Sequence, residues 1–427
     1  MRRISILISL LLSYLLGIAQ DSRIQDIDRL LKSIDSSNLL MGSLSIYQKG
    51  KEVYNFSIGW SDLRKDLKNS KHTKYRIGSI TKSFTAVIIM QLIEEKKLSL
   101  DTKISAYLPN IPNANTITIE HLLRHKSGLF NITESPTFLT WMESFHTRNE
   151  MINLIISSGT VFSPGKKKKY SNTNYILLSI IAEKIEGAKY AQILEERIFS
   201  KCQLANTYYG GEINTKHNEA LSYFYKDSDW VSSSMTDMSI PIGAGAIVSN
   251  PEDLNTFYFQ LFNGNLITEE SLNLMTSNNN LFEFALYPVL SINSKACFGH
   301  EGRIDGFHSF SAYFPDGKIS ISFCANAELI YLNELLLQIL NIYFDIPPTS
   351  QERIGCYKND NISLELTPIN SSLLAKIDNS NFYFLESSGK KKYSSLQNDI
   401  SIKFLNKDRL VIKTAQKKVL LKKELNN

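Results

Sequence analysis

The sequence has few of the residues that mark disulfide-rich, metal-ribbon or nucleic-acid-binding proteins. Only four of its 427 residues are cysteine and no C-x-x-C pair occurs, which excludes a disulfide scaffold and leaves zinc-ribbon and thioredoxin motifs without a basis. A formal net charge of +5 is too small to indicate a nucleic-acid partner. With 43% hydrophobic and 21% charged residues the chain is typical of globular proteins, and its length allows two or three domains.

Long apolar runs are also lacking, except at the N-terminus. Met1-Arg2-Arg3 is a positive start, residues 4–18 are mostly apolar, and Gly17 and Ala19 stand at the positions that a signal peptidase reads. We therefore predict a signal peptide over residues 1–19 and an exported protein, periplasmic or secreted. An uncleaved anchor is the alternative, although a membrane span needs about 20 apolar residues.

Export permits disulfides, and four cysteines allow three pairings. They lie far apart and have apolar neighbours, which favours buried thiols, so we predict no bridge among Cys202, Cys297, Cys324 and Cys356.

Residues 20–346 have strand patterns at both ends and helix patterns between them. Residues 42–60 fit two strands around Lys49-Gly50, and residues 297–326 return to a period of two, with a hairpin across Pro315-Asp316-Gly317. Helices are expected over residues 24–34, much of 79–200, and 328–343. We predict an α+β domain with a mixed, mainly antiparallel sheet built from both ends of the domain, helices packed on it, and a helical insertion.

Residues 351–427 differ in character, and Pro347-Pro348-Thr349-Ser350 before them is typical of a linker. Five short alternating runs are separated by turn-forming residues: 362–366, 382–385, 400–404, 410–413 and 418–421. They predict a small all-β domain, a sandwich or a barrel. Its 14 Lys and Arg against 8 Asp and Glu fit contact with an anionic cell-wall polymer, or simply a solvated face.

The S-x-x-K sequence Ser79-Ile80-Thr81-Lys82 is the first candidate for chemistry. A strand-like segment and Gly78 precede it and an apolar helix follows, so Ser79 and Lys82 lie on one helix face. A serine hydroxyl needs a nearby base to become a nucleophile, and a desolvated lysine can serve or can tune another base. Taken alone, the motif also fits a helix cap with a surface lysine.

Two later motifs add partners to this serine. Tyr170-Ser171-Asn172 follows a turn and opens a second apolar helix, which brings a phenol and an amide. Residues 298–302 (FGHEG) end a strand with Gly302, where a substrate can lie against backbone N–H groups that bind an oxyanion.

The three motifs, in this order, resemble the penicillin-recognising serine hydrolases, within them the class C β-lactamase and DD-peptidase branch. Further stretches are similar to the same family: HLLRHKSGL at 121–129, FSPGKKKKYSNTNYILLSIIAEKIEG at 162–187, PIGAGAIVSNPEDL at 241–254 and AYFPDGKISISFCANA at 312–327. The resemblance covers roughly residues 22–345 and implies a β-lactamase/transpeptidase-like fold. Residues 351–427 loosely resemble the small β-barrels attached to such hydrolases.

The resemblance implies a role for each motif residue. Ser79 is the implied acylated nucleophile and Lys82 its proton partner. Tyr170 is the implied base in acylation and the group that activates water in deacylation, and Asn172 positions the lysine and the substrate. The backbone N–H groups of Ser79 and Arg303 are the implied oxyanion hole.

The sequence departs from the family's lactamases at one triplet. His300-Glu301-Gly302 stands where they usually carry K-T-G, whose lysine and threonine hold the substrate carboxylate. Histidine is only partly charged near neutral pH, and Glu301 would repel a carboxylate if it faced the cleft. We predict catalytic roles for Ser79, Lys82, Tyr170, Asn172 and His300, and substrate binding by Glu301, Gly302 and Arg303.

These observations favour a serine hydrolase that cleaves an ester, a D-amino-acid peptide or a cell-wall peptide bond. The alternatives are a class C-like β-lactamase of low activity and a catalytically inert penicillin-binding protein. The expected partner is a small-molecule or short peptide substrate, with no cofactor, no metal and no nucleic acid; the oligomeric state stays open. His121 and His125 are four apart, but the glutamate usual beside the first histidine of a zinc helix is missing, so we expect structural roles.

Four consecutive lysines, residues 166–169, precede Tyr170. They could lower the pKa of the phenol and attract acidic substrates such as muropeptides. Such a run is also typical of a solvated loop.

Overall fold

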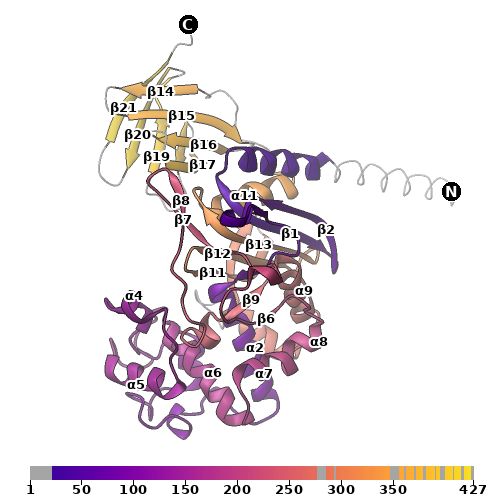
Figure 1. Cartoon of the computed structure of the whole chain (residues 1–427), viewed down its shortest axis with the longest axis vertical. Coiled ribbons are helices and arrows are strands. Elements are labelled where there is room, and N and C mark those ends of the chain that lie inside the picture. The colour runs from indigo at the N-terminus through magenta and orange to yellow at the C-terminus, as the bar shows by residue number, and fades with distance from the viewer. Residues whose placement is uncertain are drawn as a thin grey trace, which may run out of the picture. The chain divides into compact units, whose positions relative to one another are not determined.

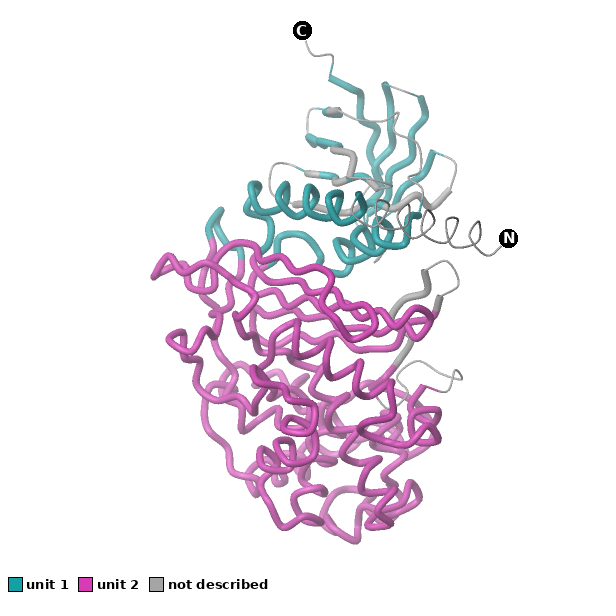
Figure 2. The backbone as a smooth tube through the Cα atoms, turned by 90° about the vertical axis from the view of Figure 1, so that its right-hand side faces the viewer, with its two compact units in different colours: residues 1–40, 225–229, 328–427 teal, residues 41–224, 230–327 magenta. Residues whose placement is uncertain are grey.

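The computed structural model describes residues 22–276, 285–292 and 295–346, and, in the C-terminal segment, 355–359, 362–369, 372–377, 381–389, 391–394, 400–406, 408–414 and 418–424. The predicted signal peptide and the predicted linker at 347–350 lie outside these residues. The chain divides into two compact units, one formed by residues 41–224 and 230–327 and the other by residues 1–40, 225–229 and 328–427 (Figure 2).

A six-stranded sheet forms one layer of the larger unit, in the order β10-β11-β12-β13-β1-β2 (Figure 1). Its strands are β1 (Leu40–Gln48), β2 (Lys51–Ile58), β10 (Tyr287–Ile292), β11 (Lys295–Ile304), β12 (Phe307–Phe314) and β13 (Ile319–Glu328). Strands β1 and β2 pair antiparallel, as do β10, β11, β12 and β13 in succession. The sheet thus joins the two ends of the predicted domain, and both predicted hairpins are confirmed.

Helices make up most of the rest of this unit. The main ones are α2 (Thr81–Glu94), α3 (Ile119–Leu123), α5 (Arg148–Ser158), α6 (Asn172–Glu186), α7 (Tyr190–Leu194) and α9 (Pro251–Phe262). Residues 81–92 of α2 are all buried, which is the pattern of a helix enclosed by protein on every side. Helix α6 ends at Gly187, whose φ of 65° is a left-handed cap that favours glycine. The predicted α+β architecture is confirmed.

The other unit contains helical residues 22–36, α11 (Leu332–Tyr343) and a closed barrel of eight antiparallel strands. The barrel strands are β14 (Gly355–Asn359), β15 (Ile362–Ile369), β16 (Ser372–Ile377), β17 (Asn381–Gly389), β18 (Lys392–Ser394), β19 (Ile400–Phe404), β20 (Arg409–Thr414) and β21 (Lys418–Lys423). Pairing of β14 with β21 closes it. The five predicted runs lie in β15, β17, β19, β20 and β21, so the small all-β domain is confirmed; β14, β16 and β18 were missed.

All four cysteines are free thiols, three of them buried. Among the described residues, no helix combines the length and the apolar character needed to cross a bilayer.

Candidate active site

Ser79 lies where a short strand turns into the central helix. Strand β5 (Tyr75–Arg76) pairs with β9 (Ile247–Ser249) and leads into the 3-10 turn η2 (Gly78–Ile80), which continues directly as α2. Gly78 has a φ of 51°, and a Cβ there would lie 2.9 Å from both the backbone N and O of Arg303. Glycine is therefore needed both for the turn and for the close approach of β11.

Two side chains converge on the hydroxyl of Ser79. Lys82 Nζ lies 2.8 Å from Ser79 Oγ, and the Tyr170 hydroxyl lies 2.7 Å from the same oxygen. Ser79 is half-buried, whereas Lys82 is fully buried, one turn further along the same helix. Tyr170 lies two residues before the start of α6, 91 positions from Ser79. The structure thus brings together the three groups that the sequence singles out.

The amine of Lys82 has two further partners. Lys82 Nζ donates to Asn172 Oδ1 at 2.8 Å and to the backbone oxygen of Ala244 at 2.7 Å. Burial lowers the pKa of Lys82 well below its ordinary value, which favours the free amine. A free amine has two hydrogens and one lone pair, so an amine that donates to these two oxygens keeps its lone pair for the proton of Ser79. The lysine is therefore suited to accept the serine proton.

The pKa of Tyr170 is shifted in the opposite direction. Burial, together with the charge of Glu301, raises the pKa of Tyr170 even though the hydrogen bond with Ser79 lowers it, so the phenol keeps its proton. Of the two interpretations of the lysine run, a lowered pKa of Tyr170 is not supported, since none of residues 166–169 is among the causes of its shift. Lys169 instead pairs with Glu134 at 2.7 Å, and burial beside Lys126 and Arg124 lowers the pKa of Lys168 to about 8.

The amide of Asn172 is held in one orientation by residues that the sequence did not single out. Asn172 Nδ2 donates to Thr133 Oγ1 at 2.8 Å, and the backbone N–H of Asn172 donates to Asn131 Oδ1 at 3.0 Å. Because a threonine hydroxyl accepts the amide hydrogen, the amide oxygen faces Lys82. Asn131 and Thr133 are positioning residues. They lie just beyond the motif at 121–129, so proximity in sequence to it was the available signal.

His125 supports the backbone on the other side of Tyr170. Its Nδ1 accepts the N–H of Ser171 at 3.1 Å, and its ring centroid lies 4.5 Å from that of Tyr170. Burial lowers the pKa of His125 well below its usual value, so the ring is neutral. His121 accepts the N–H of Thr118 and caps α3. The two histidines therefore have separate structural roles.

Strand β11 packs directly against the turn that carries Ser79. A Cβ at Gly302 would lie 2.0 Å from the backbone O of Ile77 and 2.8 Å from the backbone N of Ser79. Together with the contact between Gly78 and Arg303, this places the backbone of residues 302–303 beside the N–H of Ser79. Two backbone N–H groups so placed can bind the oxyanion of a tetrahedral intermediate.

The residues of the triplet His300-Glu301-Gly302 alternate in burial along β11. His300 is 3% exposed, its ring Nδ1 contacts the backbone oxygen of Glu301, and burial lowers its pKa to about 3. The expectation of a partly charged histidine is therefore wrong, since the ring is neutral at neutral pH. Glu301 is only half-buried, and its charge is among the causes that raise the pKa of Tyr170.

A buried ion pair fixes the far end of β11 to β5. Arg76 Nη1 donates to Asp305 Oδ2 at 2.9 Å, and Asp305 Oδ1 accepts from both the N–H and the hydroxyl of Thr236. The side chains are 3% and 0% exposed. This pair joins the strand before Ser79 to the turn after Arg303, which holds the two sides of the oxyanion site together.

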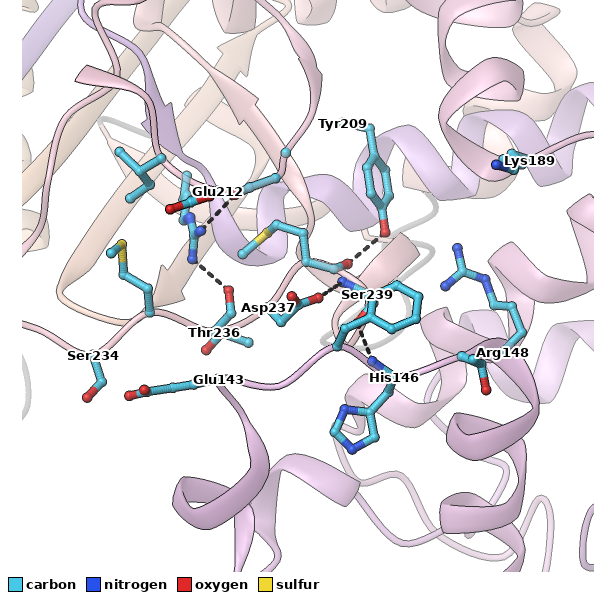
Figure 3. A pocket seen from close by; sticks show the side chains of 18 of the residues that line it. Glu143, His146, Arg148, Lys189, Tyr209, Glu212, Ser234, Thr236, Asp237 and Ser239 are labelled. Atoms are coloured by element: carbon cyan, nitrogen blue, oxygen red, sulfur yellow. Dashed lines mark hydrogen bonds between the residues drawn. The ribbon is translucent and has the colours of Figure 1, made fainter. Parts of the chain in front are cut away.

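Thr236 also lines a pocket of about 1250 Å³ (Figure 3). In its wall His146 N donates to Ser239 Oγ at 2.9 Å, and Tyr209 donates to the oxygen of Met238 at 2.7 Å. Glu143, Glu212 and Asp237 add carboxylates to its lining, which does not include Ser79, Lys82 or Tyr170. In the described part of the chain, no three His, Cys, Asp or Glu side chains gather as metal ligands do.

Known proteins are similar to this chain in sequence and in fold. The Beta-lactamase family matches residues 27–329. PbpX of Bacillus subtilis strain 168, named as a penicillin-binding protein, is 27% identical over 323 residues, 75% of this chain and 79% of PbpX. Teichoic acid D-alanine hydrolase of Staphylococcus aureus is 27% identical over 243 residues, 57% of this chain and 58% of that enzyme, so the match spans less than two thirds of its length. The structure of D-amino acid amidase from Ochrobactrum anthropi SV3 superposes with a TM-score of 0.68 at 24% identity, covering 76% of this chain and 99% of the amidase.

The fold and the family match define a serine hydrolase with a β-lactamase/transpeptidase fold. The matched region is well over half of the chain, so the chain belongs to the Beta-lactamase family. The family resemblance predicted from the sequence is confirmed.

Proposed function

We propose that the chain forms an acyl-enzyme on Ser79 and cleaves an ester or amide bond of a D-amino-acid or cell-wall peptide substrate. The observation that carries this proposal is the convergence of Lys82 Nζ and the Tyr170 hydroxyl on Ser79 Oγ, at 2.8 and 2.7 Å. Relatives named for D-alanine and D-amino-acid chemistry support the substrate class. From residues 1–19 we also propose that the enzyme is exported, which would bring it to such substrates.

The proposed acylation begins with Lys82. Its free amine takes the proton of Ser79, and Ser79 Oγ attacks the substrate carbonyl, whose oxygen becomes negative between the N–H groups of Ser79 and Arg303. The leaving group takes the proton of Tyr170, and the ammonium of Lys82 returns a proton to the phenolate. This assignment differs from the sequence prediction, which made Tyr170 the base, because the two pKa shifts favour a free lysine amine and a protonated phenol.

Deacylation uses the same groups. A water molecule loses a proton to Lys82 as its oxygen attacks the acyl carbon, and Ser79 Oγ leaves with a proton passed back through Tyr170 or Lys82. Asn172, held by Thr133, keeps the amine aligned in both steps.

A substrate panel tests this proposal. We expect a D-alanyl ester or amide to be hydrolysed with a kcat/KM at least about 100-fold above that for nitrocefin, because a neutral His300 beside Glu301 lacks the cation that holds a lactam carboxylate. A muropeptide and an N-acylated dipeptide complete the panel. Nitrocefin turnover equal to that of the best ester would favour the low-activity β-lactamase, and no turnover of any compound would favour the inert binding protein.

A further inference from the structure

Positive charge is concentrated on one part of the barrel wall. Strands β18, β19, β20, β21 and β14 are consecutive neighbours in the closed barrel (Figure 1). These five strands contain eight Lys and Arg residues and no Asp or Glu, whereas β15, β16 and β17 contain one Lys and two Glu. All eight cations except Lys423 are exposed. We call the exposed Lys and Arg residues of these five strands the basic face.

The pairing of the strands places the cations of the basic face opposite one another. Lys422 on β21 pairs with Arg409 on β20 on one side and with Lys358 on β14 on the other. Two further pairs of cations stand directly opposite: Lys413 with Lys418, and Lys392 with Lys403. Opposing residues of antiparallel strands have Cβ atoms about 5 Å apart, and like charges there are destabilising. A bound anion would offset this repulsion.

Carboxylates neutralise little of the basic face. Glu424, directly after β21, pairs with Lys358, and Asp408 lies in the connection that leads into β20. In the part of the barrel that the structure describes, four lysines have no ion-pair partner: Lys403, Lys413, Lys418 and Lys422. Most of the basic face is therefore open to an anion from outside the chain.

The curvature of the barrel favours a flexible polymer over a flat membrane. The five strands are more than half of the eight in the wall, and a plane touches only one side of a closed barrel. Membrane-binding faces also present Trp, Phe or Leu to the lipid. The aromatic residues of the five strands, Tyr357, Tyr393 and Phe404, are buried, and Leu420 is the one large apolar side chain exposed in these described strands. Without an exposed aromatic ring, these strands offer nothing on which the bases of a single-stranded nucleic acid stack.

We propose that the basic face binds a polyol phosphate, a flexible chain of phosphodiesters, which runs across the wall from β18 to β14. Five strands about 4.8 Å apart span roughly 19 Å, and a chain joined by single bonds bends over this width, whereas a polyuronate built of sugar rings is stiffer. A phosphodiester has two free oxygens, so each can accept from one ammonium group of an opposing pair. The inference goes beyond the proposed function, because it concerns the barrel and not Ser79.

Binding of the full chain to fluorescein-labelled poly(glycerol phosphate), followed by fluorescence anisotropy, tests this inference. If about four cations engage phosphates, raising NaCl from about 50 to about 200 mM should weaken the affinity roughly 50-fold, because each contact releases counterions. The triple variant Lys413→Gln, Lys418→Gln, Lys422→Gln should bind at least about tenfold more weakly at the lower salt concentration, and its salt dependence should be shallower.

Matched variants separate the basic face from the overall charge of the chain. Three exposed lysines of the larger unit provide the control, and Lys51→Gln, Lys96→Gln, Lys184→Gln together should change the affinity less than about twofold. Arginine at the three barrel positions keeps the charge and should keep the affinity within about threefold.

Thermal unfolding of the variants should not follow the loss of binding. The three glutamines in the barrel relieve repulsion between opposing cations, so the unfolding midpoint should be unchanged or higher although binding is weaker. A lower midpoint together with weaker binding would indicate a structural role for these lysines and would overturn the inference.

The remaining outcomes also decide the question. The inference is overturned by no binding at low salt, by equal losses in the barrel and control variants, by loss of affinity in the arginine variant, or by equal affinity for polygalacturonate. Stronger binding to phosphatidylglycerol vesicles than to the polymer would make the basic face a membrane-binding surface instead. None of these measurements uses turnover by Ser79, so they leave the proposed function to its own test.

Discussion

Replacing Lys82 by methionine is expected to lower kcat/KM by roughly 1000-fold, because a general base supplies about 10² to 10⁴ of the rate. Methionine is similar in length and apolar, which suits the fully buried position. Tyr170→Phe should cost less, about 10- to 100-fold, since it removes the proton relay to the leaving group while the base remains. Steady-state kinetics on a D-alanyl ester, with circular dichroism to verify folding, measure both.

The pH profile separates the two candidate bases. The pKa of Lys82 is lowered, so the free amine is present above that depressed pKa and kcat/KM falls only as the pH drops through it. The pKa of Tyr170 is raised, so its loss of a proton lies above the ordinary value of about 10. The acid limb should therefore persist in Tyr170→Phe. If the acid limb disappeared in Tyr170→Phe and Lys82→Met kept its activity, Tyr170 would again be assigned as the base.

An exposed lysine beside the site serves as the matched control. Lys169 lies next to Tyr170 in sequence, and its amine pairs with Glu134 at the surface. Lys169→Met should change kcat/KM less than about twofold, since exposed ion pairs contribute little. A large loss in this variant would revive an electrostatic role for the lysine run.

Gly302→Ala is expected to lower kcat by about 100-fold, the effect of losing one oxyanion donor. The added Cβ would lie 2.0 Å from the backbone oxygen of Ile77 and 2.8 Å from the nitrogen of Ser79, so β11 must move away from the turn of the nucleophile. Gly211→Ala is the control, because a Cβ there meets nothing within 4 Å. Wild-type kcat in Gly302→Ala would contradict the proposed oxyanion site.

Local patterns in the sequence, together with the family resemblance, were sufficient to predict the architecture and to single out three side chains that the structure brings together. Ser79 and Lys82 are about one helical turn apart, and Tyr170 lies just before the N-cap of an apolar helix, so short-range rules placed each group correctly on its element. Strand β18 was missed because its three residues are too few to show a period of two, and β16 because SLLAKI does not alternate strictly.

Burial was what the sequence did not reveal. The neutral state of His300 and the shifts at Lys82 and Tyr170 depend on desolvation by elements distant in the chain. The oxygen of Ala244 that holds the lysine is a backbone group, which has no signature in the side-chain sequence. Thr133 and Asn131 act through Asn172, a contact 39 to 41 positions away that only the folded chain reveals.

The most direct test of the account is the mass of the intact protein after exposure to a fluorophosphonate, followed by peptide mapping. The account predicts one adduct per chain, on Ser79. In Ser79→Ala both the adduct and the turnover of esters should be absent. An adduct on a different residue, or undiminished turnover by Ser79→Ala, would contradict the claim that Ser79 is the nucleophile.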